Sequence, residues 1–143
     1  MSSAVTAAKG LRAATAVALL QFAAHTTLFL RATPRHGPDE VAVVAAMQAH
    51  RFDFAGSTRS YWDFYTGYGL EAAVICLVEA VLFWILAGAV GAHASVVRPV
   101  VGLFLAFNVA HLALMARYFF VTPMVPDAVI ALVLAVVWAK LRR

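Results

Sequence analysis

The sequence predicts an all-α membrane protein, a bundle of four transmembrane helices with a short extra helix in the first external loop. Hydrophobic residues make up 64% of the 143-residue chain and charged residues only 13%, whereas a soluble domain carries about 25% charged residues. Four apolar stretches are long enough to cross a bilayer, which takes about 20 helical residues. We therefore expect one membrane domain over residues 1–143.

The four spans are predicted from apolar stretches bounded by charges, prolines or short connections. They cover about residues 11–30, 64–90, 97–120 and 127–140. The first is longer than the apolar core of a signal peptide, contains Gln21 and His25, and lacks a clean small-residue cleavage site after it. A connection of only five residues, 91–95, predicts that the second and third spans form an antiparallel pair. Pro123 and Pro126 are expected to end the third span and start the fourth.

Basic residues predict the orientation. Four spans place both termini on one side, which then carries Lys9, Arg12, Arg98, Lys140, Arg142 and Arg143. The other side carries Arg31, Arg35, Arg51, Arg59 and Arg117. Because Lys and Arg favour the cytoplasmic side, we expect cytoplasmic termini and a multi-pass protein of the bacterial cytoplasmic (inner) membrane. The basic residues gather at span ends, so membrane lipids rather than nucleic acid are the expected partners, despite a pI near 9.7.

The external loop, residues 31–63, is expected to contain a short helix from about Gly37 to His50. Pro38 suits the first helical position, and Asp39 and Glu40 in the first turn complement the helix dipole. Four residues at helical spacing predict one face that lies on the bundle mouth or at the headgroups: Val41, Val44, Ala45 and Gln48.

Ionisable residues within the spans are the main candidates for chemistry, because a charge in hydrocarbon costs at least about 2.5–3.5 kcal/mol. His25, Glu71 and His111 each lie about 9–10 Å below the outer end of a span. We predict that they form the catalytic acid–base set, since a carboxyl at the depth of Glu71 must be neutral or paired. Asn108 accompanies them, whereas Glu79 lies deeper and has no partner that the sequence identifies. The alternative is that the histidines and Asn108 only join helices by hydrogen bonds.

A second group of candidate functional residues lies in residues 51–71, which lead into the second span. Aromatic, arginine and aspartate side chains gather here, and Gly67 and Gly69 leave the helix surface bare above Glu71, so that a helix or a ligand could come close. The simpler interpretation of Tyr61 and Trp62 is that they belong to an aromatic belt at the membrane interface. The ligand-binding residues predicted for this approach and the later spans are Arg59, Trp62, Asp63, Tyr65, Tyr68, Asn108, Arg117 and Tyr118. A polar lid over the opening is predicted from His50, Arg51, Asp53, Arg59 and Asp63.

The same stretch resembles the sequence of a known family. Its residues are His50-Arg51-Phe52-Asp53, Gly56, Arg59-Ser60-Tyr61-Trp62-Asp63-Phe64-Tyr65, Gly67 and Gly69, and later Arg117-Tyr118-Phe119-Phe120. In these the chain resembles a family of small four-helix bacterial integral membrane proteins that has no established activity. The resemblance implies the four-helix architecture and points to the lid and the pocket mouth, and it implies no substrate.

The leading functional hypothesis is a pocket in the outward half of the bundle for a lipophilic small molecule, such as an isoprenoid, sterol-like compound, quinone or polyketide. Glu71, with His111 or His25, would transfer protons in an isomerisation or cyclisation that needs no cofactor. The single Cys76 excludes a disulfide framework or a cysteine zinc site, and no metal site is expected.

Two alternatives stay open. His25 and His111 could be the axial ligands of a haem in a four-helix bundle, which would make the protein a haem- or quinone-binding redox protein. Alternatively, the chain could be a non-enzymatic accessory or transport subunit. Small residues such as those at 87–89 would then join its spans to those of a second copy in a homo-oligomer.

Overall fold

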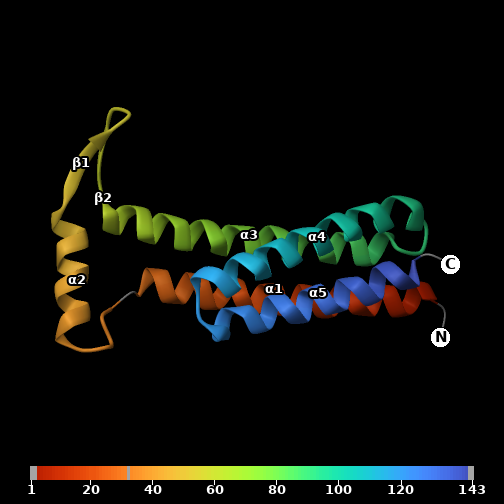
Figure 1. Ribbon diagram of the computed structural model, residues 1–143. Helices are drawn as coiled ribbons and strands as arrows, with labels where there is room; N and C mark the ends of the chain where they lie inside the picture. The colour runs from red at the N-terminus through yellow and green to blue at the C-terminus, as the bar shows by residue number, and fades with distance from the viewer. Residues whose placement is uncertain (1–2, 32, 142–143) are drawn as a thin grey trace. The chain divides into compact units, whose positions relative to one another are not determined.

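The computed structural model describes residues 3–31 and 33–141 and is drawn in Figure 1. The elements in chain order are α1 (Ser3–Leu30), α2 (Pro38–Ala49), β1 (Arg51–Phe54), β2 (Ser57–Ser60), α3 (Tyr61–Ala89), α4 (Ala94–Tyr118) and α5 (Val121–Lys140). Within the described residues, α1, α3, α4 and α5 are long and apolar enough to cross a membrane. The predicted all-α class with four spans and one short extra helix is confirmed. Arg142 and Arg143, which entered the charge comparison, lie outside the described residues.

The chain divides into two structural units. The first, here called the bundle unit, comprises the described residues up to Gln21 and those from Cys76 onward. The second, here called the hairpin unit, is Phe22–Ile75 and contains the end of α1, α2, both strands and the first half of α3.

One apolar core joins all four long helices in the bundle unit. Fully buried side chains come from each of them, among them Leu11, Phe83, Val101 and Leu134. Gly10 of α1 faces α5 so closely that a Cβ atom on it would lie 2.7 Å from Val137. The first turns of α1 therefore pack beside the last turns of α5, as Figure 1 shows.

The outer surface of the long helices is largely apolar. Leu20 on α1, Trp84 on α3, Leu103 on α4 and Leu132 on α5 are each more than 60% exposed. Soluble monomers rarely expose so much contiguous apolar surface. A lipid environment would cover these side chains, in agreement with the predicted spans.

Helix α2 begins at Pro38 as predicted, and it ends one residue before His50. Glu40 anchors its start, because one carboxylate oxygen accepts the backbone N–H of His36 at 2.5 Å and that of Arg35. The predicted apolar face of α2 is not buried, because no residue of this helix is buried. Of its four predicted face residues, Val44 is half-buried and the other three are exposed. Its place at the bundle mouth or the headgroups stays a prediction.

A β-hairpin that the sequence analysis did not predict follows α2. Strands β1 and β2 pair antiparallel, with Phe54 opposite Ser57 next to the turn. Ala55 and Gly56 form the two-residue turn, both with positive φ, 50° and 79°. Such a turn needs left-handed backbone at both central positions, usually supplied by Asn-Gly or Asp-Gly. Ala55 adopts the left-handed conformation although alanine does not favour it, so the sequence carries no strong signal for this turn.

All four long helices begin earlier than predicted. α1 begins at Ser3 rather than near Leu11, α3 at Tyr61 rather than Phe64, α4 at Ala94 rather than Val97, and α5 at Val121 rather than Asp127. The predicted break between the third and fourth spans is present, because α4 ends at Tyr118 and α5 begins at Val121. Pro123 lies in the first turn of α5, where backbone N–H groups have no helical partner to lose. Pro126 then lies inside the helix, and Asp127 moves from the helix start to its second turn.

Candidate ligand-binding site

The start of α3 is set by a reciprocal pair of hydrogen bonds. The Asp63 N–H donates to the Ser60 hydroxyl at 3.1 Å, and the Ser60 N–H donates to the Asp63 carboxylate at 2.8 Å. This is a capping box, which satisfies two N–H groups at a helix start. The cap places Asp63 in the first turn of α3 rather than in a loop. The Ser-x-x-Asp spacing was a sequence signal for it.

One face of the hairpin meets one stripe of α3. Phe54, Ser57 and Arg59 share a face because side chains alternate along a strand and directly opposed residues point the same way. Phe64, Gly67, Tyr68 and Glu71 fall at helical positions i, i+3, i+4 and i+7, which form one stripe. The folded hairpin and the first turns of α3 thus bring together residues that lie 17 positions apart in sequence.

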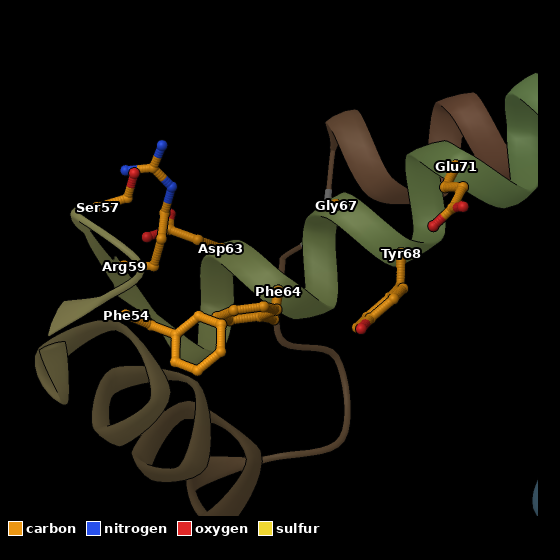
Figure 2. A pocket seen from close by; sticks show the side chains of 8 residues that line it. All are labelled: Phe54, Ser57, Arg59, Asp63, Phe64, Gly67, Tyr68 and Glu71. Carbon is orange, nitrogen blue, oxygen red and sulfur yellow. The ribbon is translucent and has the colours of Figure 1, made fainter. Parts of the chain in front are cut away.

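These residues line an open pocket of about 390 Å³, here called the hairpin pocket. Its lining comprises Phe54, Ser57, Arg59, Asp63, Phe64, Gly67, Tyr68 and Glu71. Figure 2 shows Ser57, Arg59 and Asp63 together at one end, the rings of Phe54 and Phe64 beside each other, and Glu71 at the far end beyond Tyr68. The eight-residue separation of Asp63 and Glu71 corresponds to about 12 Å along the helix.

Arg59 and Asp63, whose opposite charges interact, lie at one end of the hairpin pocket, and Glu71 lies at the other. The Arg59 guanidinium donates to the Thr58 carbonyl at 2.8 Å, and among the described residues it forms no ion pair with a carboxylate. Glu71 is exposed and likewise makes no hydrogen bond or ion pair within the described chain. A guanidinium and a carboxyl are thus both available to a ligand, with aromatic rings between them.

The five predicted ligand-binding residues in or before α3 divide into two groups. Arg59, Asp63 and Tyr68 line the hairpin pocket, whereas Trp62 and Tyr65 pack on each other, with ring centroids 5.3 Å apart.

The far side of α3 meets α1 within the hairpin unit. Tyr65 also contacts Phe29 of α1, whose ring is stacked with that of His25. Gly69 lies against Phe29 so closely that a Cβ atom there would overlap the ring, while a Cβ at Gly67 would meet nothing within 4 Å. Of the two glycines, Gly69 therefore serves helix approach and Gly67 opens the hairpin pocket.

A second polar cluster is buried in the bundle unit. The Gln21 side-chain amide donates to Asp127 at 2.7 Å, and the His111 Nδ1 atom lies 3.1 Å from the other oxygen of Asp127. The Asn108 amide donates to Glu79 at 2.7 Å and to the carbonyl of its own helix at Phe104. The Asp127 residue is 3% exposed, whereas the His111 side chain is 34% exposed. Five polar side chains from four helices thus form two neighbouring sets of contacts, one around Asp127 and one between Asn108 and Glu79.

Asp127 was missed by the sequence analysis, and Glu79 was left without a partner. Asp127 lies on the buried face of α5. The apolar residues of this face follow it at helical spacing and are Ile130, Ala131 and Leu134. That spacing was the available signal. It was overlooked because Pro126 indicated a helix start at this point.

The remaining predicted residues lie elsewhere. Arg117 is stacked over the ring of its neighbour Tyr118 at 5.4 Å, and the pair is exposed at the end of α4 in the bundle unit. Among the predicted catalytic residues, Glu71 and His25 belong to the hairpin unit and His111 belongs to the bundle unit. The joint acid–base set of these three residues and the haem alternative stay predictions.

No group of three or more His, Cys, Asp or Glu side chains that could hold a metal ion occurs in residues 3–31 and 33–141. Comparisons with protein-family models, with curated proteins and with solved structures found no match. Inferences about function therefore depend on this chain's own residues.

Proposed function

We propose that the hairpin pocket binds a lipophilic small molecule with a polar end, and that Glu71 exchanges a proton with it in an isomerisation or cyclisation. The observation that carries the proposal is the junction of one hairpin face with one stripe of α3. It places Arg59 and Glu71, neither of which forms an ion pair within the described residues, at opposite ends of an aromatic pocket. Its volume falls in the usual range for ligand pockets, about 300–1,000 Å³.

The pocket lining supports an elongated ligand. The rings of Phe54, Phe64 and Tyr68 offer apolar surface between the two charged groups, and aromatic rings bury large apolar areas with few rotatable bonds. Arg59 suits an anionic or carbonyl end, since its guanidinium presents several N–H donors. The pocket lies beside the start of an apolar helix, so a membrane-dissolved molecule could enter without crossing water.

Glu71 is the best-placed group for proton transfer. An isomerisation removes a proton from one carbon and returns it to another, so one carboxyl that accepts and then releases the proton balances the reaction without a redox partner. Tyr68, one turn before Glu71, adds an O–H donor in the same pocket. His25 and His111 stay predicted partners for this proton.

Binding is tested by mass spectrometry of lipophilic molecules that co-purify with the protein. We expect the wild type to retain a molecule that is lost by about 10-fold or more in Glu71→Ala, because a hydrogen bond to a charged group contributes about 1.5–3 kcal/mol. Asp39→Asn is the matched control, since it changes an exposed carboxylate of α2 outside the pocket. Equal retention by the wild type and Glu71→Ala would remove the binding proposal.

Proton transfer is tested separately with the retained molecule. Incubation in deuterated buffer should exchange its acidic C–H hydrogen or convert it to an isomer with the wild type. Glu71→Gln, which keeps the shape of the side chain, should bind the molecule but exchange it at least about 100-fold more slowly, in line with general-base contributions. Unchanged exchange in Glu71→Gln would leave a binding protein without acid–base chemistry.

A further inference from the structure

A groove runs between the first turns of α1 and the last turns of α5, and it shares no residue with the hairpin pocket. It measures about 450 Å³ and is lined by Thr6, Ala7, Lys9, Gly10, Leu132, Val133, Val136, Val137 and Lys140. Gly10 explains the close approach of the two helices, since any Cβ atom there would press on Val137. Figure 1 shows the start of α1 and the end of α5 side by side.

The two lysines at this groove have no acidic partner among the residues that the structure describes. Lys9 and Lys140 are exposed, and neither forms an ion pair within the described residues. The side-chain carboxylates of the bundle unit are Glu79 and Asp127. Both are buried and hydrogen-bonded within the polar cluster. Neither of these carboxylates is therefore free to pair with the two lysines, which leaves their charges available to an external anion.

The groove wall on α5 is apolar from Val137 back to Leu132. Leu132 lies eight residues before Lys140, which corresponds to about 12 Å of helix. In a span, this wall lies in hydrocarbon, while lysines near a helix end extend their ammonium groups toward the headgroups. An apolar groove whose lining includes two lysines is complementary to an acyl chain that ends at a phosphate.

We propose that this groove binds one anionic phospholipid of the phosphatidylglycerol type, with an acyl chain along Leu132 and Val136 and the phosphate between Lys9 and Lys140. Basic pockets between membrane helices bind anionic headgroups in this way. A zwitterionic phospholipid fits less well, because its own cation repels the lysines. The bound lipid would hold the start of α1 and the end of α5 in the leaflet that contains the anionic lipid.

Native mass spectrometry of the full chain tests the proposal. The protein is released from nanodiscs that contain equal amounts of phosphatidylglycerol and phosphatidylcholine with identical acyl chains. We expect one tightly bound phosphatidylglycerol, preferred about 10- to 30-fold, from about 1 kcal/mol for each basic side chain near the headgroups. The double variant Lys9→Gln, Lys140→Gln should reduce the preference to near unity, and Lys9→Arg, Lys140→Arg should keep it.

Two further variants separate the headgroup from the groove. Arg12→Gln removes an exposed cation of α1 that stacks on Trp84 outside the groove, and it should keep the preference. Val136→Phe should narrow the groove and reduce retention of both lipids. Glu71→Ala should leave lipid retention unchanged, so that failure of the proposed function and failure of the lipid site are distinguishable.

Four results would overturn the lipid site. They are equal binding of both lipids by the wild type, an unchanged preference in the Lys9→Gln, Lys140→Gln variant, displacement of the lipid by millimolar inorganic phosphate, and a dimer of the chain that carries no lipid. The phosphate result would show that the lysines hold a free anion and that the groove contributes nothing. The dimer would show that a second copy covers the groove.

Discussion

At the scale of single residues, Asp127 joins three helices of the bundle unit. Its two carboxylate oxygens meet Gln21 of α1 and His111 of α4. Hydrogen bonds between membrane helices contribute about 0.6 kcal/mol on average, and a buried polar group that loses its partner costs about 1–3 kcal/mol. The side chain is therefore important for the arrangement of these helices.

Asp127→Ala should lower the free energy of unfolding by about 1–3 kcal/mol, because it removes the carboxylate that Gln21 and His111 contact. Asp127→Asn should cost less, since an amide oxygen can still accept from Gln21. Unfolding in mixed detergent micelles, followed by circular dichroism, measures both, with Asp39→Asn as the control on an exposed carboxylate. If Asp127→Ala unfolds as the wild type does, the cluster is unimportant for stability.

Glu40 is the second residue with a testable consequence. The backbone N–H groups of His36 and Arg35 stabilise its carboxylate and lower the pKa of Glu40 below the ordinary value of 4.5. Because the folded-state pKa is depressed, the carboxylate stabilises the start of α2 above about pH 4.5, and this contribution is lost as the pH falls through the folded-state pKa.

An NMR titration of the Glu40 carboxyl carbon should therefore give a midpoint below 4.5. In the Glu40→Gln variant, the amide protons of Arg35 and His36 should exchange faster at neutral pH, because the charged acceptor is gone. A Glu40 midpoint at or above the ordinary value would contradict the anchoring contacts.

At the scale of elements, Gly69 sets how closely α3 approaches the end of α1 within the hairpin unit. Gly69→Ala and Gly67→Ala gain the same helix propensity, about 1 kcal/mol, so their difference isolates the contact with Phe29. We expect Gly69→Ala to be less stable than Gly67→Ala by about 1–3 kcal/mol, the usual cost of overpacking. Thermal unfolding of the two variants measures the difference. Equal stabilities would show that Phe29 moves aside freely.

The capping box decides where α3 begins. Ser60→Ala should destabilise the chain by about 1 kcal/mol and should speed amide hydrogen exchange at Asp63, whose N–H donates to the Ser60 hydroxyl. Ser60→Thr keeps the hydroxyl and should keep the protection. Unchanged exchange at Asp63 in Ser60→Ala would mean that the cap does not hold the first turn of the pocket helix.

At the scale of the whole molecule, the predicted topology is open to chemical labelling. With Cys76 changed to Ser, single cysteines at Ser3 and Ser95 should be shielded from an impermeant maleimide in intact cells, and one at Gln48 should react. This pattern follows from four spans with cytoplasmic termini. The reverse pattern would invert the orientation, and labelling of Ser95 together with Gln48 would contradict four spans.

Sequence alone was sufficient for the four long helices and for α2. An apolar stretch of span length has one means of satisfying its backbone in a bilayer, which is the helix, and Pro38 with Asp39 and Glu40 is a local start signal. It also identified most residues of the hairpin pocket, because Arg59, Asp63, Tyr68 and Glu71 combine charge and aromatic character next to a span.

Tertiary structure alone decided which of these residues meet. Phe54 and Ser57 enter the pocket only because a turn at Ala55 and Gly56 folds β1 onto β2, and left-handed backbone at alanine leaves no sequence signal. Asp127 meets Gln21 across 106 positions of the chain. Such a pairing depends on helix rotation and register, which are set by the packing of small residues such as Gly10 against α5. Periodicity along one helix shows which face is apolar, but the partner of a buried carboxyl lies on another helix.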